Sequence, residues 1–205
     1  MVSRLVVFGN RTAQEVREAA ELAFESRFES ISTEYFEEEK FFKTLVPKYE
    51  SSSAKVYYFA AVADIRVRQQ IVRVCDQANW SPISIVHPSA VISRSAKIDS
   101  GVFIGPLAVV SSNATIGAHS IVHIHASVGH DATIGEGATI LPGARISGNV
   151  RLGKHVLVGS NAFLNADIEI GDESHIDALT YVVRSVPEKM IVSVRASSPM
   201  RRVGF

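Results

Sequence analysis

An aliphatic residue occupies every sixth position of the chain from Val86 to Val182. The residue two places before each is mostly Ala or Ser, and the residue after it is often Gly. A short fixed period is typical of a solenoid, and a period of six is typical of a β-helix. Because side chains alternate across a strand, the aliphatic residue and the small residue two places earlier point to the same side. The pattern therefore predicts a column filled by aliphatic and small side chains.

Each six-residue unit is expected to form one short parallel strand and one corner, so that three units of about eighteen residues close a triangular coil. Coils stack at the inter-strand spacing of about 4.8 Å, which places residues eighteen apart one above another. We expect a left-handed parallel β-helix, an exception to the right-handed preference of parallel crossovers. The Gly residues that follow the aliphatic positions are expected at bends, where a missing Cβ relaxes the backbone limits.

The chain before the repeat has a different pattern. Apolar runs predict strands at 5–8, 28–33, 55–61 and 83–86, and helical periodicity predicts helices from Thr12 to about Glu25 and after Asp64, which is placed to cap its helix. Alternating strands and helices predict a small Rossmann-like α/β unit. Ligands of such a unit bind at the carboxyl ends of its strands, here 9–12, 33–35 and 61–64.

Three segments follow from these patterns: an α/β domain at 1–84, a left-handed β-helix domain at 85–183 and a basic C-terminal tail at 184–205. The chain has 205 residues and a formal net charge of zero, which argues against a general nucleic-acid partner. The single cysteine, Cys75, suits a reducing compartment. With no charged-then-apolar leader and no apolar run of membrane-spanning length, we expect a cytoplasmic protein without a membrane span.

Three motifs lie close together in the repeat: GHDATIG at 129–135, LPGA at 141–144 and ISGNV at 146–150. Together with the preceding α/β unit, they resemble the sialic acid O-acetyltransferase and bacillosamine/perosamine N-acetyltransferase family of bacterial surface-glycan synthesis. The resemblance implies an acetyl-CoA-dependent acetyltransferase that acts on a nucleotide-linked sugar held by the 1–84 domain. It also implies a homotrimer with its sites between neighbouring helices. The nucleotide, the sugar and the choice between an amine and a hydroxyl acceptor stay open.

Acyl transfer from a thioester needs a base and a donor for the oxyanion. His130 is the candidate base, because histidine titrates near neutral pH, and Asp131 beside it can orient the ring. Adding eighteen to His130 gives Gly148, whose N–H is left open to the thioester oxygen; the family uses the matching amide in this way. Zinc is not required by this chemistry, and we expect no metal.

Small residues and arginines supply the other candidate contacts. The resemblance implies that the pantetheine of acetyl-CoA passes small residues of the repeat, and arginines of the basic tail are candidates for its phosphates, with a solvated tail as the alternative. The candidate acetyl-CoA contacts are Pro142, Gly143, Ala144, Gly148, Gly159, Asn161, Arg201 and Arg202. The candidate substrate contacts are Gly9, Asn10, Arg11, Thr12, Asp64, His123 and His125.

Two other functions compete with the transferase. His125 and His130 are five residues apart, as in γ-class zinc carbonic anhydrases built on the same helix, and neutral imidazoles suit zinc. However, Ser89 stands two coils before His125, where a third His would be needed, and that class lacks an α/β unit. A non-catalytic trimeric sugar-binding protein is the other alternative.

Overall fold

The computed structural model describes residues 3–9, 11–50, 54–195 and 200–201. The chain divides into two compact units, Met1–Pro88 and Ser89–Phe205. The division falls slightly beyond the position 84 suggested by the sequence pattern, and residues after 184 cluster with the second unit. Each unit has its own topology.

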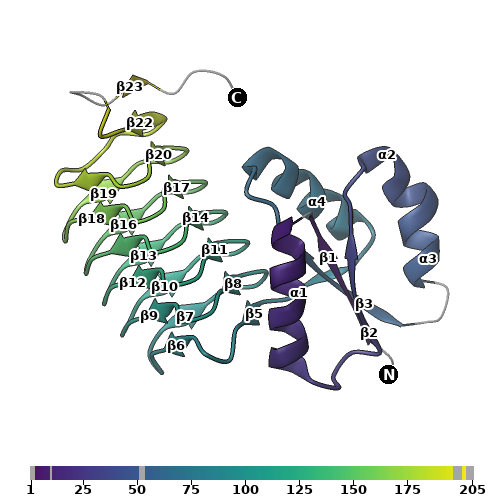
Figure 1. Cartoon of the computed structure of the whole chain (residues 1–205). Coiled ribbons are helices and arrows are strands. Elements are labelled where there is room, and N and C mark those ends of the chain that lie inside the picture. The colour runs from purple at the N-terminus through teal and green to yellow at the C-terminus, as the bar shows by residue number, and fades with distance from the viewer. Residues whose placement is uncertain (1–2, 10, 51–53, 196–199, 202–205) are drawn as a thin grey trace. The chain divides into compact units, whose positions relative to one another are not determined.

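The first unit contains a four-stranded parallel sheet in the order β2-β1-β3-β4 (Figure 1). Its strands are β1 (Ser3–Phe8), β2 (Ser30–Glu34), β3 (Lys55–Ala60) and β4 (Ser81–Pro82), and β5 (Ile85–Val86) follows them. The helices α1 (Arg11–Phe24) and α4 (Ile65–Gln77) alternate with the strands. Since β2 and β3 lie on opposite sides of β1, the strand order reverses there, which is where open parallel sheets bind ligands.

The cap of α4 is the one expected. Asp64 Oδ1 accepts hydrogen bonds from the N–H groups of Arg66 at 2.9 Å and Val67 at 3.4 Å. These bonds satisfy two of the amide groups that a helix N-terminus leaves unpaired. The start of α4 is therefore fixed at the edge of the sheet where a ligand is expected.

The helical segment between β2 and β3 was not expected as a core element. It comprises α2 (Glu38–Lys40), the π-helix η1 (Phe41–Leu45) and α3 (Val46–Glu50). Phe41, Leu45 and Tyr49 are buried in one cluster with Trp80, whose ring lies 5.2 Å from that of Phe41. The acidic stretch that opens the segment, Glu37 to Glu39, is exposed, and Glu38 pairs with Arg73 at 2.5 Å.

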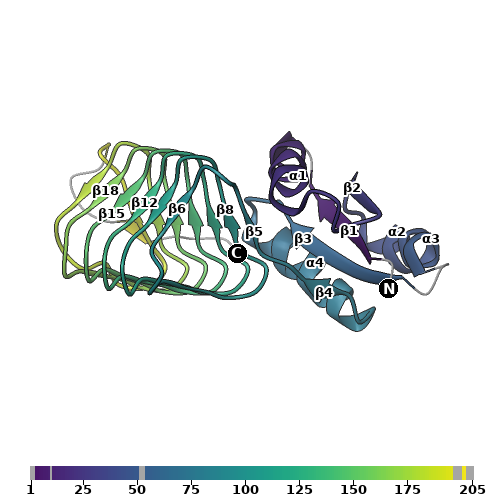
Figure 2. The same cartoon turned by 90° about the horizontal axis from the view of Figure 1, so that it is seen from below.

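The second unit is a column of two-residue parallel strands arranged in three faces (Figures 1 and 2). This arrangement fits the expected left-handed parallel β-helix. The five-stranded face has β7 (Lys97–Ile98), β10 (Thr115–Ile116), β13 (Thr133–Ile134), β16 (Arg151–Leu152) and β19 (Glu169–Ile170). The six-stranded face has β6 (Val91–Ile92), β9 (Val109–Val110), β12 (Ser127–Val128), β15 (Arg145–Ile146), β18 (Phe163–Leu164) and β21 (Tyr181–Val182). The third face includes β8 (Phe103–Ile104), β11 (Ile121–Val122), β14 (Thr139–Ile140), β17 (Leu157–Val158), β20 (His175–Ile176), β22 (Met190–Val192) and the antiparallel β23 (Met200–Arg201).

Residues eighteen apart lie side by side on all three faces, as predicted. Ser127 pairs with Arg145, and Thr133 pairs with Arg151, in consecutive coils. The aliphatic positions from Ile104 to Val182 are buried, whereas Val86, Ile92 and Ile98 in the first coil are half-buried. The Ala residues two places before the buried positions, such as Ala126 and Ala132, are fully buried. The interior of the column is therefore the one that the six-residue pattern indicates.

The glycines after the aliphatic positions are needed for a different reason from the one expected. The positive φ values fall three places after the aliphatic residue, for example at Asn113 and Asp131, both at 58°. An added Cβ on Gly117 would instead lie 2.7 Å from Glu136 N, in the next coil. Close contact between coils, rather than a special torsion angle, selects glycine there.

The repeat loses its register after Val182. Ile170 bridges Val186, and His175 of β20 pairs with Ile191 of β22, so the last partners are sixteen residues apart instead of eighteen. The last coil is therefore shorter than the others, because its corner contains fewer residues.

We predict that Gly117→Ala destabilises the protein by about 1–3 kcal/mol, because the new Cβ presses on the backbone of the next coil and that backbone cannot retreat without breaking its own ladder. Urea unfolding monitored by circular dichroism measures the change. Ser112→Ala, at an exposed corner of the same coil, is the matched control and should change stability by less than about 0.5 kcal/mol. Equal stability of the two variants would contradict the close packing of the coils.

Candidate active site

His130 lies at the corner between the six-stranded and five-stranded faces, directly below Gly148 of the next coil. An added Cβ on Gly148 would lie 2.5 Å from His130 Nε2, and the Asn149 N–H donates to His130 O at 2.9 Å. The His130 side chain is 59% exposed, so its ring is accessible to a ligand. The eighteen-residue spacing thus brings the imidazole and the Gly148 backbone together, as the sequence predicts.

Asp131 fixes the orientation of the His130 ring. His130 Nδ1 lies 2.8 Å from Asp131 Oδ2. An ionised carboxylate can only accept hydrogen bonds, so Nδ1 carries the proton of the neutral ring. The lone pair then resides on Nε2, the atom beside Gly148, which is the tautomer that a general base requires.

A third side chain holds the other oxygen of the same carboxylate. Asn113 Nδ2 donates to Asp131 Oδ1 at 3.0 Å from the preceding coil. The hydrogen bond from His130, and then that from Asn113, hold the pKa of the Asp131 carboxyl below its ordinary value. The carboxyl is therefore ionised at neutral pH. Sequence analysis missed Asn113, although subtracting eighteen from Asp131 identifies it.

The Gly148 N–H is a candidate donor to a ligand. Within the described ranges of the chain, no hydrogen-bond acceptor is found for this amide. Gly148 itself is partly exposed. An unpaired amide beside a basic ring nitrogen is a suitable arrangement for an oxyanion that forms near the base.

The candidate acetyl-CoA contacts do not form one set around His130. Gly143 and Asn161 lie at positive φ on a different corner, between the third and six-stranded faces, and Asn161 N–H donates to Pro142 O at 3.0 Å. Two candidates need correction, because Ala144 is fully buried inside the column and Gly159 is buried beneath Ala178 of the next coil. Ala144 exposes no surface to a ligand in this chain, and Gly159 exposes little.

The two histidines proposed beside the substrate differ in exposure. His123 is buried, whereas His125 is exposed at the same corner as Gly143, at a φ of 58°. His125 and His130 therefore stand at different corners of the coil. Across the part of the chain that the structure describes, no group of three His, Cys, Asp or Glu side chains could hold a metal ion. The carbonic anhydrase alternative has no zinc site in these residues.

A cavity of about 340 Å³ lies at the carboxyl edge of the parallel sheet in the first unit. It is lined by Gly9, Thr12, Tyr35, Phe36, Ala61, Val62, Ala63, Asp64 and Val67. Gly9 is required there, since its φ is 149° and an added Cβ would lie 2.5 Å from Ala61 O. Sequence analysis located this edge correctly, and it missed only Phe36 and Val67 among the lining residues.

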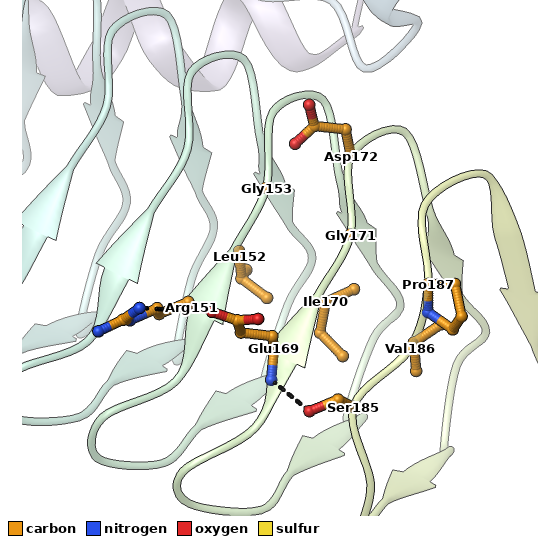
Figure 3. Close-up of a pocket in the computed structure, with 10 residues that line it drawn as sticks. All are labelled: Arg151, Leu152, Gly153, Glu169, Ile170, Gly171, Asp172, Ser185, Val186 and Pro187. Atoms are coloured by element: carbon orange, nitrogen blue, oxygen red, sulfur yellow. Dashed lines mark hydrogen bonds and ion pairs between the residues drawn. The ribbon is translucent and has the colours of Figure 1, made fainter.

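A second cavity of about 380 Å³ lies on the five-stranded face, at the coils where the repeat loses its register (Figure 3). Glu169 N–H donates to Ser185 Oγ at 3.0 Å, and Arg151 Nη1 lies 3.4 Å from Glu169 Oε1. The side chains of Leu152 and Ile170 point away from these groups, into the column (Figure 3). This groove contains none of the predicted site residues.

The basic tail can be described in part. Arg184, Lys189 and Arg195 are exposed. The side chains of Arg11 and Arg201, and residues Asn10 and Arg202, lie outside what the structure describes. Their predicted contacts with substrate and acetyl-CoA therefore remain predictions.

Comparison with protein families identifies the repeat. Residues 113–148 match the model described as bacterial transferase hexapeptide (six repeats), and residues 149–184 match the hexapeptide repeat of succinyl-transferase. A segment of 63 residues is 33% identical to the GDP-perosamine N-acetyltransferase of Escherichia coli O157:H7. That segment is 31% of this chain and spans only 28% of the curated relative.

Solved structures share the fold over nearly the whole chain. A histidine-to-asparagine variant of perosamine N-acetyltransferase from Caulobacter crescentus, in complex with CoA and GDP-perosamine, has a TM-score of 0.84 at 20% identity and covers 97% of both chains. The acetyltransferase domain of PglB from Neisseria gonorrhoeae FA1090 has a TM-score of 0.83 at 24% identity, covering 96% of this chain and 99% of that chain. The resemblance expected from the sequence motifs is thus confirmed. None of the described helices is both long and apolar enough to cross a membrane.

We predict that the Asp131 carboxyl titrates below the ordinary aspartate pKa of about 3.9, and that His130→Ala raises its midpoint by removing the larger of the two stabilising hydrogen bonds. Because the folded pKa is lowered, the stability that this carboxylate contributes is present above the unfolded pKa and is lost as the pH falls through the folded pKa. Carbon-13 NMR of the carboxyl group measures both midpoints. An unchanged midpoint in His130→Ala would mean that the two side chains do not interact in solution.

Proposed function

We propose that this hexapeptide-repeat protein is an acetyl-CoA-dependent acetyltransferase that uses His130 as its general base to acetylate a nucleotide-linked sugar. The observation that carries the proposal is the arrangement at one corner. Asp131 holds the Nδ1–H of His130, which leaves Nε2 unprotonated beside the Gly148 amide. Structural relatives in complex with CoA and GDP-perosamine support the choice of substrates.

The reaction follows from the positions of these groups. His130 Nε2 takes the proton of the acceptor amine or hydroxyl as that atom forms a bond to the acyl carbon of the thioester. The Gly148 N–H donates to the oxygen on which the negative charge develops. When the carbon–sulfur bond breaks, the protonated His130 returns its proton to the departing CoA thiolate, which leaves the ring neutral for the next cycle.

The basic C-terminal segment is proposed to bind the phosphates of acetyl-CoA. Arg184, Lys189 and Arg195 are exposed and follow the coils that lie beyond Gly148. The guanidinium group suits phosphate because it presents several donors in a planar fork. Arg201 and Arg202 belong to the same proposed set on the grounds of sequence alone.

The first unit is proposed to be a Rossmann-like domain that holds the nucleotide-linked sugar. Its cavity opens where the strand order of the sheet reverses, and Tyr35 offers a 70% exposed ring on which a base can stack. Asp64 is the one charged side chain among the lining residues that the structure describes. This lining suits a base and a sugar better than a diphosphate, whose charge would need Arg11 or another cation.

A homotrimer is the proposed assembly. Two exposed apolar pairs lie on the outside of the six-stranded face, Val91 with Val109 and Phe163 with Tyr181, and Ser127 and Arg145 separate the two pairs. Exposed apolar patches of this kind mark interaction surfaces. Because His130 lies at the edge of that face, a second copy packed against the face would place the candidate site at the rim of the interface.

Synthesis of a bacterial surface glycan in the cytoplasm is the setting we propose for the reaction.

We predict that His130→Ala lowers kcat at least about a hundredfold, which is within the usual contribution of a positioned base. The melting temperature should stay unchanged, since the side chain is mostly exposed. Loss of thioester absorbance, with acetyl-CoA and a panel of nucleotide-linked amino and hydroxy sugars, measures the rate and identifies the acceptor.

His175→Ala is the matched control. His175 Nε2 lies 3.3 Å from Asp177 Oδ1, so it forms a second His–Asp pair on the same column, away from Gly148. The control should retain the wild-type rate. Near-normal turnover of His130→Ala would remove the base assignment, and an absence of transfer by the wild-type protein with every acceptor would favour the non-catalytic sugar-binding alternative.

We predict that Ala63→Trp raises the KM for the nucleotide-linked sugar about tenfold or more, because the indole fills a cavity of about 340 Å³ in which the substrate is proposed to bind. The KM for acetyl-CoA should not change, and it serves as the internal control. Equal increases in both KM values would point to a general loss of structure, and no change in either would place the sugar elsewhere.

A further inference from the structure

We propose that Asn113 is a positioning residue for the reaction, and that it completes the hydrogen-bonded chain Asn113–Asp131–His130 across two coils. This inference rests on the proposed role of His130. It assigns a function to a side chain in the coil before the one that carries the base, outside all three sequence motifs.

The hydrogen bonds divide the Asp131 carboxylate between two donors. Asn113 Nδ2 donates to Oδ1 at 3.0 Å, and His130 Nδ1 lies 2.8 Å from Oδ2. Each oxygen therefore has one side-chain partner within the chain. With Oδ1 occupied, the carboxylate plane is fixed, and Oδ2 is directed at the imidazole.

The orientation of the carboxylate needs this support because the His130–Asp131 pair is exposed. The side chains of His130 and Asp131 are 59% and 46% exposed, so water competes for both oxygens and burial restrains the carboxylate only in part. If the carboxylate rotated away, the neutral ring could carry its proton on Nε2, where it can no longer accept one from the substrate. The hydrogen bond from Asn113 restrains the Asp131 carboxylate, as burial does in other active sites.

Asn113 is itself held in place by the corner. Its φ of 58° equals that of Asp131, and its N–H donates to Ser95 Oγ at 3.0 Å in the preceding coil. Asn tolerates this left-handed conformation better than most residues. The same corner position thus provides both the backbone geometry and a side chain long enough to reach Asp131.

The amide has no part in proton transfer. Asn113 remains neutral, Asp131 remains ionised, and the Nδ1–H stays on the ring while Nε2 gains and loses the substrate proton. The residue therefore acts through Asp131, and its removal should affect the chemical step more than the binding of either substrate.

Asn113→Gly is the test variant, because Gly keeps the positive φ and the backbone N–H while it removes the amide. We expect kcat to fall about tenfold, as for other residues that orient a catalytic histidine through its partner. The KM values for acetyl-CoA and for the sugar should not change. In long-range nitrogen-15 spectra of the His130 ring, the population protonated at Nε2 should rise relative to wild type.

Asp167→Gly is the matched control. Asp167 lies at the same corner two coils beyond Asp131, at a φ of 61°. Its N–H donates to Gly148 O at 3.2 Å, and no side-chain hydrogen bond of Asp167 is found among the described residues. It should retain the wild-type kcat and ring spectrum. Asn113→Asp is the second variant, in case Asn113→Gly does not fold: it tolerates the same φ, loses the donor and places a like charge beside Asp131, so it should show the same loss and the same spectral change.

Two results would overturn the proposal: a wild-type kcat and ring tautomer in the Asn113 variants, or an equal fall of kcat in Asp167→Gly, which would indicate a general effect of the corner. The ring spectra are recorded without substrate. If the wild-type protein transfers no acetyl group, the proposed function fails, whereas the spectra still decide whether Asn113 sets the tautomer of His130.

Discussion

The stacking of one coil on the next through backbone hydrogen bonds is the interaction on which the candidate site depends. Strand N–H groups donate to the following coil, as Gly129 N–H does to Ile146 O at 2.8 Å, and corner N–H groups donate to the preceding coil, as Asp131 N–H does to Ser112 O at 2.9 Å. Since buried backbone groups must be paired, a coil cannot slide past its neighbour without losing a whole set of these bonds. The vertical alignment of side chains is therefore as rigid as the ladder itself.

This alignment explains how a site can be built on an exposed corner. His130, Asp131, Asn113 and Gly148 come from three coils, and each is placed by its own backbone bonds to the coil above or below. A site on an ordinary surface loop would need burial or a lid to hold such groups. Here the repeat restrains the backbone, and the hydrogen bonds of Asp131 with Asn113 and His130 restrain the side chains.

The two units contribute different properties to the proposed reaction. The column supplies a base with a defined tautomer and an unpaired amide. The α/β unit supplies a cavity at the point where its strand order reverses, with Gly9 allowing the backbone to come close to Ala61. Tyr35 and Asp64 give that cavity an aromatic and an anionic contact. In the proposed reaction, recognition of the sugar is assigned to the first unit and acyl transfer to the second.

The sequence by itself determined the coil, because a six-residue period constrains each aliphatic side chain to the interior, and it determined that His130 meets Gly148, since that follows from adding one coil length. It also located the edge of the parallel sheet that holds a cavity, from the ends of its strands. Tertiary structure decided what the period leaves open. It showed that Ala144 and Gly159 are buried, that His125 stands at another corner from His130, and that Phe41, Leu45 and Tyr49 pack into one core cluster with Trp80. It also brought Asn113 to Asp131. A period specifies where along the column a residue lies, but the direction of a polar side chain and its partner depend on contacts between coils, which only the folded chain makes.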